Sequence, residues 1–158
     1  MFRPVRRKKN EISIEEAKKL LSEARRGVLA VNGDDGYPYA LPVNYYYDEG
    51  EGRIFFHSAR VGHKVDALEK SDKVCFTVLG QETVKAEPWA PFVRSAVVFG
   101  RCHPVTDPSE AEARLRQFAG KYYPDAELID EVIAGFGKAA LIYAIEIEHL
   151  SGKEVQER

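Results

Sequence analysis

The clearest alternation of hydrophobic and polar positions lies between residues 37 and 47. A period of two is typical of a β-strand with one buried face. Pro38 and Pro42 lie inside this run, and proline has no backbone N–H to donate to a neighbouring strand. We therefore expect a strand at a sheet edge, or one that bulges near Pro42. The apolar face is predicted to hold Tyr39, Leu41, Val43, Tyr45 and Tyr47.

Further short runs rich in β-branched, aromatic and aliphatic residues predict more strands. The turn-forming residues 48–52 join the first run to a partner strand and so predict a hairpin. Segment 80–94 is polar, carries prolines and contains Trp89, and it predicts a loop. The additional strands are expected at 27–31, 53–57, 73–79, 95–105 and 140–149.

Helix starts are marked by capping residues. Ser13 with Glu16 has the spacing of a capping box and predicts a helix that ends near Gly27. Asp107 followed by Pro108 predicts another, with an apolar stripe along one side. Two shorter helices are expected, one beginning near His63 and one over 126–134.

Strands joined by short turns outnumber crossover helices, which favours a mainly β, largely antiparallel barrel of about six strands with peripheral helices, in one domain over residues 1–158. No GxGxxG motif follows a strand, so a Rossmann dinucleotide site is not expected. A barrel this small has no interior room for a ligand, and a cofactor must lie on an outer face or between subunits.

Composition adds few constraints. Hydrophobic residues make up 44% of the 158 residues and charged residues 30%, with a net charge of -2, which is typical of a soluble globular protein. The basic run between Arg3 and Lys9 is interpreted as a solvated tail, and no nucleic-acid partner is expected. No stretch is apolar enough to span a bilayer and the N-terminus has no secretory signal, so we expect a cytoplasmic protein.

The cysteines and histidines show no metal-ligand spacing. Cys75 and Cys102 lie in separate apolar runs and are expected to be buried free thiols, not a disulfide or zinc site. His103 and His149 end strands and are expected to be ordinary side chains. We predict no metal site.

The best candidate for ligand chemistry is residues 57–64, which leave a strand, pass through small residues and open a helix. Free N–H groups at a helix start, with a hydroxyl and a lysine nearby, suit an anion such as phosphate. Ser58 can donate to a phosphate oxygen, Gly62 permits close backbone approach, and Lys64 supplies charge. The alternative is structural: Ser58 caps the helix and Lys64 is solvated.

The proline-interrupted strand offers a second candidate. If pairing is interrupted near Pro42, the backbone of residues 42–44 has unpaired donors and acceptors. These suit the alternating donors and acceptors on the pyrimidine edge of a flavin. The alternative is a plain edge strand whose proline blocks further pairing.

These segments resemble a known family, the FMN-binding split-barrel proteins related to pyridoxamine 5'-phosphate oxidase, and within it the Nim-type nitroimidazole-resistance flavoproteins. The resemblance covers almost the whole chain. It depends on the order and spacing of RRK at 6–8, GYPY at 36–39, PVNY at 42–45, IFFHSA at 54–59, GHK at 62–64, RSAVVFGR at 94–101, IEIE at 145–148 and SGK at 151–153.

The resemblance implies a split β-barrel that forms a homodimer, with FMN in two clefts between the subunits. Ser58 and Lys64 match residues that hold the phosphate, and the strand 41–44 matches the one beside the isoalloxazine ring. His57 and His63 match histidines of the Nim-type motif and are the candidate catalytic residues. Trp89 and Ser95 are expected to contribute from the partner subunit. The complete predicted cofactor site is Leu41, Pro42, Val43, Asn44, His57, Ser58, Ala59, Val61, Gly62, His63, Lys64, Trp89 and Ser95.

The function expected from this resemblance is a flavin-dependent oxidoreductase that passes electrons from a reduced nicotinamide or another donor to a small-molecule acceptor, such as a nitro compound. The alternative is a non-enzymatic FMN- or haem-binding carrier or sensor. The family's pyridoxamine phosphate oxidases carry a C-terminal segment rich in Arg and Trp. Residues 151–158 do not match it, so pyridoxine chemistry is not expected.

Overall fold

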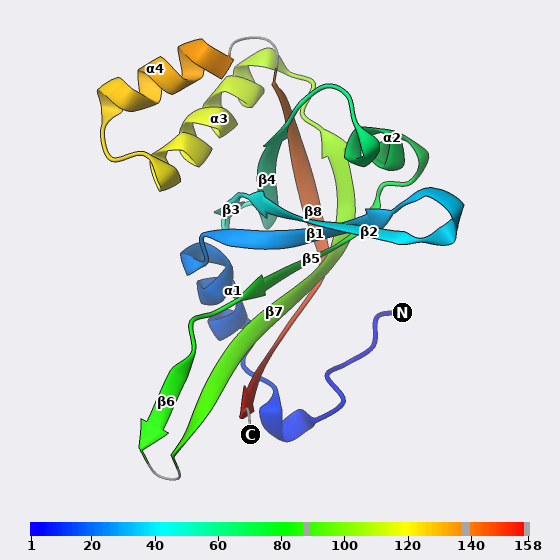
Figure 1. Ribbon diagram of the computed structural model, residues 1–158, viewed down its shortest axis with the longest axis vertical. Helices are drawn as coiled ribbons and strands as arrows, with labels where there is room; N and C mark the ends of the chain where they lie inside the picture. The colour runs from blue at the N-terminus through cyan, green and yellow to red at the C-terminus, as the bar shows by residue number, and fades with distance from the viewer. Residues whose placement is uncertain (87–88, 137–139, 157–158) are drawn as a thin grey trace.

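The computed structural model describes residues 1–86, 89–136 and 140–156, and shows a strongly bent antiparallel sheet with helices around it (Figure 1). The main path of the sheet is β2-β1-β5-β7-β8-β4-β3, and β6 pairs with β7. The strands are β1 (Arg26–Asn32), β2 (Pro38–Asn44), β3 (Tyr46–Asp48), β4 (Arg53–Ser58), β5 (Lys73–Leu79), β6 (Thr83–Ala86), β7 (Trp89–Pro104) and β8 (Leu141–Gln156). The helices are α1 (Ile14–Glu23), α2 (His63–Lys70), α3 (Pro108–Tyr122) and α4 (Ala126–Phe136), with short 3-10 turns at Lys8–Asn10 and Asp34–Gly36.

The core has two parts, separated by the sheet. The larger part fills the inside of the bend, where β4 contributes Ile54 and Phe56. The smaller part lies on the other side of β4, where Phe55 packs against Leu115 and Phe118 of α3. Alternate residues of one strand therefore serve two different cores.

The run 37–47 forms two strands rather than one. β2 ends at Asn44, and β3 begins at Tyr46 and pairs with β4, which confirms the hairpin. The Tyr45 N–H donates to the Tyr122 hydroxyl at 2.9 Å instead of to a strand. β2 is an edge strand, as its prolines predict, and it pairs with β1 in continuous register without a bulge.

The first helix starts as predicted and ends earlier than predicted. The reciprocal bonds of the capping box between Ser13 and Glu16 are present. However, α1 ends at Glu23, and Gly27 lies within β1. A Cβ at Gly27 would lie 2.2 Å from Cζ of Phe76, so the glycine lets β1 pack closely on that ring.

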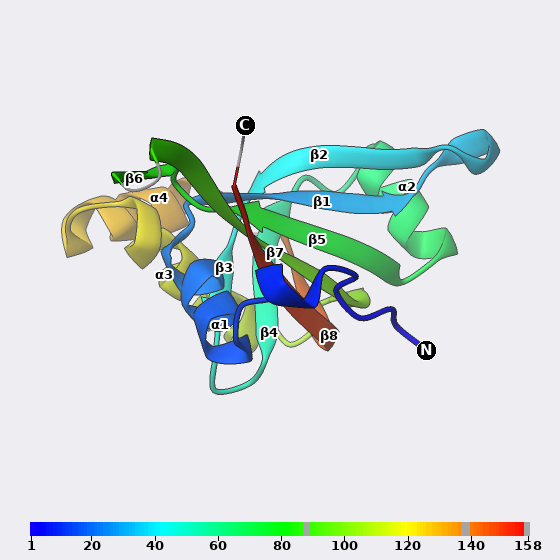
Figure 2. The same ribbon diagram turned by 90° about the horizontal axis from the view of Figure 1, so that it is seen from below.

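The predicted loop over 80–94 is wrong. β6 and the first part of β7 form a hairpin that projects away from the bend, at the end opposite to α2 in both views (Figures 1 and 2). The last strand is also longer than predicted, because β8 continues to Gln156 beside β7. A shift in register after Phe99 bends this pair, and a Cβ at Gly100 would lie 2.2 Å from the Glu146 carbonyl oxygen.

The later helices agree with their sequence signals. Asp107 accepts the Glu110 N–H at 2.8 Å and Pro108 is the first residue of α3. Helix α4 packs on α3 (Figure 1). Within the described ranges no helix is long and apolar enough to cross a membrane. The cytoplasmic location stays a prediction.

Candidate functional site

Residues 57–64 connect the end of β4 to the start of α2. Gly62 precedes the helix with φ 131° and ψ 171°, a conformation that is essentially restricted to glycine, and no side chain caps the helix. The Asp66 N–H is the first to bond within the helix, to the Gly62 carbonyl at 3.0 Å. The N–H groups of residues 63–65 therefore have no partner in the helix and are open to an anion.

Ser58 does not cap this helix, so that alternative is wrong. Its side chain is buried, and its hydroxyl donates to the Ala59 carbonyl at 2.8 Å. The serine therefore braces the turn that leaves β4, and this bond uses its one hydroxyl hydrogen. Its predicted contact with phosphate stays a prediction.

Lys64 is half-buried, not fully solvated. Its ammonium lies 5.5 Å from the ring centre of Phe56, and burial lowers the pKa of the lysine. Within the described ranges, Lys64 has no hydrogen bond or salt bridge to a side-chain or backbone oxygen. A partly desolvated cation beside uncapped N–H groups is a suitable environment for a phosphate.

The start of α2 lies against β2, the other predicted part of the site. The His63 ring stacks on Tyr39 with ring centres 4.1 Å apart, and its Nε2 lies 3.7 Å from the Asp34 carboxylate. Gly33 leaves room for this packing, because a Cβ there would lie 3.0 Å from the Tyr39 Cβ and 3.4 Å from the His63 Nε2. The start of α2 therefore lies beside the first half of β2, the strand that also carries residues 41–44.

One edge of β2 pairs with β1, and among the described residues no strand pairs with its other edge. Main-chain groups on that edge are therefore free of strand partners. Pairing with β1 begins where Gly33 donates to Tyr37 at 2.9 Å, and in an antiparallel pair every second residue is hydrogen-bonded to its partner. By this alternation the main-chain groups of Ala40, Pro42 and Asn44 point away from β1. They supply carbonyl acceptors and, except at the proline, N–H donors, as a flavin edge requires.

His57 lies in different surroundings from His63. It points to the outer side of β4, where its ring packs against Phe118 and Phe136 with ring centres 4.9 and 5.1 Å away. Its Nδ1 is buried without a hydrogen-bond partner among the described residues. Burial lowers the His57 pKa, and the charge of Lys64 adds to this. The two histidines predicted to be catalytic therefore do not converge on one point.

Trp89 and Ser95 lie on β7, where Trp89 is paired with Ala86 of β6 and Ser95 with Leu79 of β5 and Lys153 of β8. Trp89 is 76% exposed on the projecting hairpin. Within one chain these two residues do not join the other predicted site residues. Their predicted role in a partner's site stays a prediction.

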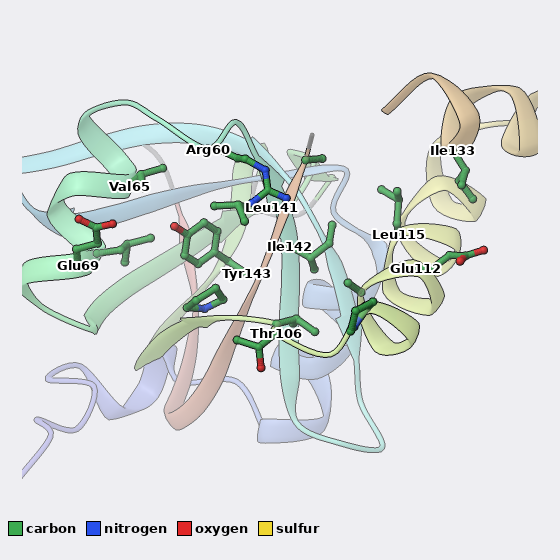
Figure 3. Close-up of a pocket in the computed structure, with 16 residues that line it drawn as sticks. Arg60, Val65, Glu69, Thr106, Glu112, Leu115, Ile133, Leu141, Ile142 and Tyr143 are labelled. Atoms are coloured by element: carbon green, nitrogen blue, oxygen red, sulfur yellow. The ribbon is translucent and has the colours of Figure 1, made fainter. Parts of the chain in front are cut away.

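A groove that the sequence did not predict lies across the beginning of β8, between α2 and α3 (Figure 3). Its volume is about 1010 Å³. In the sequence, the apolar residues of α2 and α3 could have indicated this groove, but the same pattern is typical of residues buried in the core. Its walls and floor include Arg60, Val65, Leu68, Glu69, Thr106, Ala111, Glu112, Leu115, Ile133, Leu141, Ile142 and Tyr143.

The cysteines form no disulfide in the structure. Cys102 is buried and Cys75 is half-buried, and both are free thiols. Burial raises the pKa of Cys102 to about 12, so this thiol is unreactive near neutral pH. Cys75 also has a raised pKa through burial.

Comparison with known proteins identifies relatives of this architecture. A family model of pyridoxamine 5'-phosphate oxidase matches residues 13–154. No curated protein gave a significant match.

Solved structures share the fold over most of this chain. A candidate 5-nitroimidazole antibiotic resistance protein from Bacteroides thetaiotaomicron is 17% identical, with a TM-score of 0.79, over 92% of this chain and 87% of its own. An FAD-binding protein from Mesorhizobium loti is 23% identical, with a TM-score of 0.67, over 92% and 96%. A flavocytochrome from Azotobacter vinelandii is 19% identical, with a TM-score of 0.70, over 94% and 71%. These similarities establish the split β-barrel fold that the sequence predicts.

Proposed function

The chain belongs to the pyridoxamine 5'-phosphate oxidase family, and we propose that it binds FMN at the region formed by β2 and residues 57–64. The observation that carries the proposal is Lys64, a half-buried cation without a described ion-pair partner, beside the uncapped start of α2. Two proteins of the same fold are named for flavin, as an FAD-binding protein and as a flavocytochrome.

In this proposal each part of the region has one task. Lys64 and the backbone of residues 59–65 hold the phosphate, and Ser58 donates to it once its hydroxyl turns from the Ala59 carbonyl. The isoalloxazine ring lies along residues 41–44, where outward carbonyl and N–H groups meet its polar edge. The region has one half-buried cation for one phosphate group, which favours FMN over the diphosphate of FAD.

We further propose that two copies associate through the outer face of β1, β5 and β7. Side chains on this face come from residues that alternate with the core, and none of those in its centre is charged. Val28 and Phe99 remain 44% and 38% exposed there. Exposed apolar patches of this kind mark protein interfaces. In such a dimer, Trp89 and Ser95 would reach the partner's flavin.

The proposed activity is electron transfer from a reduced nicotinamide or another donor, through the flavin, to a small acceptor. The flavin supplies the redox chemistry, and the protein positions it and limits access. Nitro reduction is the favoured acceptor chemistry, because one protein of this fold is named for 5-nitroimidazole resistance. His63, which is exposed beside Tyr39, is better placed to meet a substrate than His57, which two phenylalanines enclose.

The test is to purify the full chain and identify its bound ligand by absorption spectrum and mass. FMN at one molecule per chain in a dimer supports the proposal. A protein that neither carries nor takes up a flavin would overturn it, and a Soret band without flavin would favour a haem carrier. Anaerobic titration with NADH or NADPH then separates an oxidoreductase from a module whose flavin stays oxidised.

A further inference from the structure

We propose that the C-terminal end of α3 positions the strand along which the flavin ring lies. Lys121 and Tyr122 are inserted where β2 separates from β1, directly after residues 42–44. The inference deepens the proposed function and rests on it, because it assigns the residues that hold the ring-binding main chain in place. Both residues act through Tyr45 and not on the flavin itself, so they are positioning residues.

The register of β1 and β2 shows which bond the Tyr122 hydroxyl replaces. Arg26 is opposite Asn44 in the last pair of the ladder, so Arg25 would be opposite Tyr45 in the next. By the alternation along β2, that next pair would be a hydrogen-bonded one. Instead, the Tyr122 hydroxyl accepts the Tyr45 N–H at 2.9 Å and donates to the Arg25 carbonyl. The inserted hydroxyl therefore stops the ladder at Asn44.

Lys121 holds the two chain segments apart at the same point. Its ammonium donates to the Ala24 carbonyl at 2.7 Å, just before β1, and to the Tyr45 carbonyl at 3.0 Å. The Tyr122 hydroxyl also lies 2.9 Å from the Tyr45 carbonyl, but its one hydrogen is donated to Arg25. The Tyr45 carbonyl therefore depends on Lys121 for its hydrogen bond.

Tyr45 is fixed on its remaining side as well. Its side chain is fully buried, and its hydroxyl donates to the Leu21 carbonyl of α1. Its ring meets Phe76 edge-on, with ring centres 4.9 Å apart. With its N–H, carbonyl and hydroxyl all held, Tyr45 leaves Asn44 little freedom to turn. The outward main-chain groups at the end of β2 are thus presented in one orientation.

Helix α3 also contacts the other part of the proposed flavin region. Phe118 lies one turn before Tyr122, and the two rings are 4.9 Å apart. The Phe118 ring packs on His57, which is next to Ser58 in the segment proposed to hold the phosphate. One helix therefore touches both the ring-binding strand and the phosphate-binding segment, and it fixes the spacing between them.

The test compares FMN with riboflavin, which has the same ring and no phosphate, by fluorescence quenching on the full chain. In Tyr122→Phe, Arg25 and Tyr45 can pair directly, which draws Asn44 toward β1. Both flavins should then bind about tenfold more weakly, with the ratio of their affinities unchanged. Lys121→Met should act in the same way. Lys64→Met, in contrast, should weaken FMN and leave riboflavin unchanged.

Two control variants separate positioning from general stability. Tyr123→Phe removes the same atom from the next residue, whose hydroxyl has no hydrogen bond among the described residues. Asp107→Ala removes the cap at the other end of α3. Both controls should keep the wild-type affinity for both flavins. The midpoint potential of bound FMN should move toward that of free FMN in Tyr122→Phe and stay unchanged in the controls.

The outcomes distinguish this inference from the proposed function. A wild type that binds FMN, together with wild-type affinity for both flavins in Tyr122→Phe and Lys121→Met, would overturn the inference and leave the proposed function standing. Loss of FMN affinity alone in these two variants, with riboflavin unchanged, would also overturn it. A wild type that binds neither flavin would overturn the proposed function, and the inference with it.

Discussion

Two helices of this protein start shortly after a strand, and they start in different ways. Helix α3 follows β7, and its first turn is completed by its own chain, through the Asp107 side chain and Pro108. Helix α2 follows β4, and Gly62 leaves its first N–H groups without a side-chain cap. The start of α3 is thus completed by its own chain, whereas the start of α2 is uncapped, and it is there that we propose the phosphate binds.

The two helix starts also differ in the charge of their first turns. Glu110 lies in the first turn of α3, where a carboxylate complements the partial positive charge of the helix start. In the first turn of α2, Lys64 adds positive charge, and only Asp66 opposes it. An anion bound at this end would remove an unfavourable interaction that the chain itself does not relieve.

The largest expected effect is loss of FMN affinity in Lys64→Met. Removing a charge-assisted phosphate contact should weaken binding about 10- to 150-fold, equivalent to about 1.5–3 kcal/mol. Stability should not fall, because burial already disfavours the charged lysine. The measurement is FMN fluorescence quenching together with urea unfolding.

Lys70→Met is the matched control for this prediction. Lys70 lies at the other end of α2 and pairs with Asp34 at 3.1 Å on the surface. FMN affinity should be unchanged in this variant. Equal losses in the two variants would mean that general charge, not the start of α2, attracts the phosphate.

Second in size is the effect of Gly62→Ala on folding. A Cβ in this backbone conformation costs about 1–3 kcal/mol. Gly120 offers the contrast, since it lies exposed inside α3 and a Cβ there would meet nothing within 4 Å. Gly120→Ala should therefore stabilise the protein by roughly 0.5–1 kcal/mol. Urea unfolding of both variants measures the difference, and stabilisation by Gly62→Ala would show that α2 does not need this conformation.

The sequence predicted those features whose partners lie close together along the chain. Both caps were recognised because Ser13 and Glu16, or Asp107 and Glu110, are three residues apart. Pro38 and Pro42 predicted that β2 either lies at a sheet edge or bulges near Pro42, and the edge position is the one found. Residues 57–64 were singled out as a candidate anion site from their own residue types, and the family resemblance is confirmed over residues 13–154.

Features that depend on distant contacts could not be predicted. The break at Tyr45 is held by Tyr122 and by Lys121, which donates to the Tyr45 carbonyl at 3.0 Å, and no local pattern records these contacts. The separation of His57 from His63 follows from the alternation along β4 and from the packing of α3 and α4. The groove is formed by elements from three parts of the chain. The apolar residues of each part have the pattern of ordinary core residues, so the sequence does not predict that they line a groove.

A third prediction tests the start of α3 by itself. Asp107→Ala removes the acceptor of the Glu110 N–H and should lower the free energy of unfolding by about 1 kcal/mol. FMN affinity should stay at the wild-type value, because the cap belongs to the fold. Thermal and urea unfolding, with an FMN titration as the second readout, check both parts. A large loss of FMN affinity would show that the two helix starts are not independent.

The smallest expected effect is a pH dependence that arises from His57, between the two helices. Burial lowers the pKa of His57 in the folded state, and the charge of Lys64 lowers it further. In the unfolded chain His57 becomes protonated near pH 6.5, whereas in the folded chain it becomes protonated only at lower pH. The free energy of unfolding should therefore fall as the pH drops from 7.5 to 5.5. Urea unfolding at these two pH values measures the fall and avoids the range in which the carboxylates titrate, which is lower.

Two variants test the cause. The free energy of unfolding should fall less in His57→Leu than in the wild type. Lys64→Met should give an intermediate fall, since it removes only the second cause. An unchanged fall in His57→Leu would mean that the proton binds elsewhere, and an unchanged fall in Lys64→Met would mean that the charge of Lys64 does not act on this histidine.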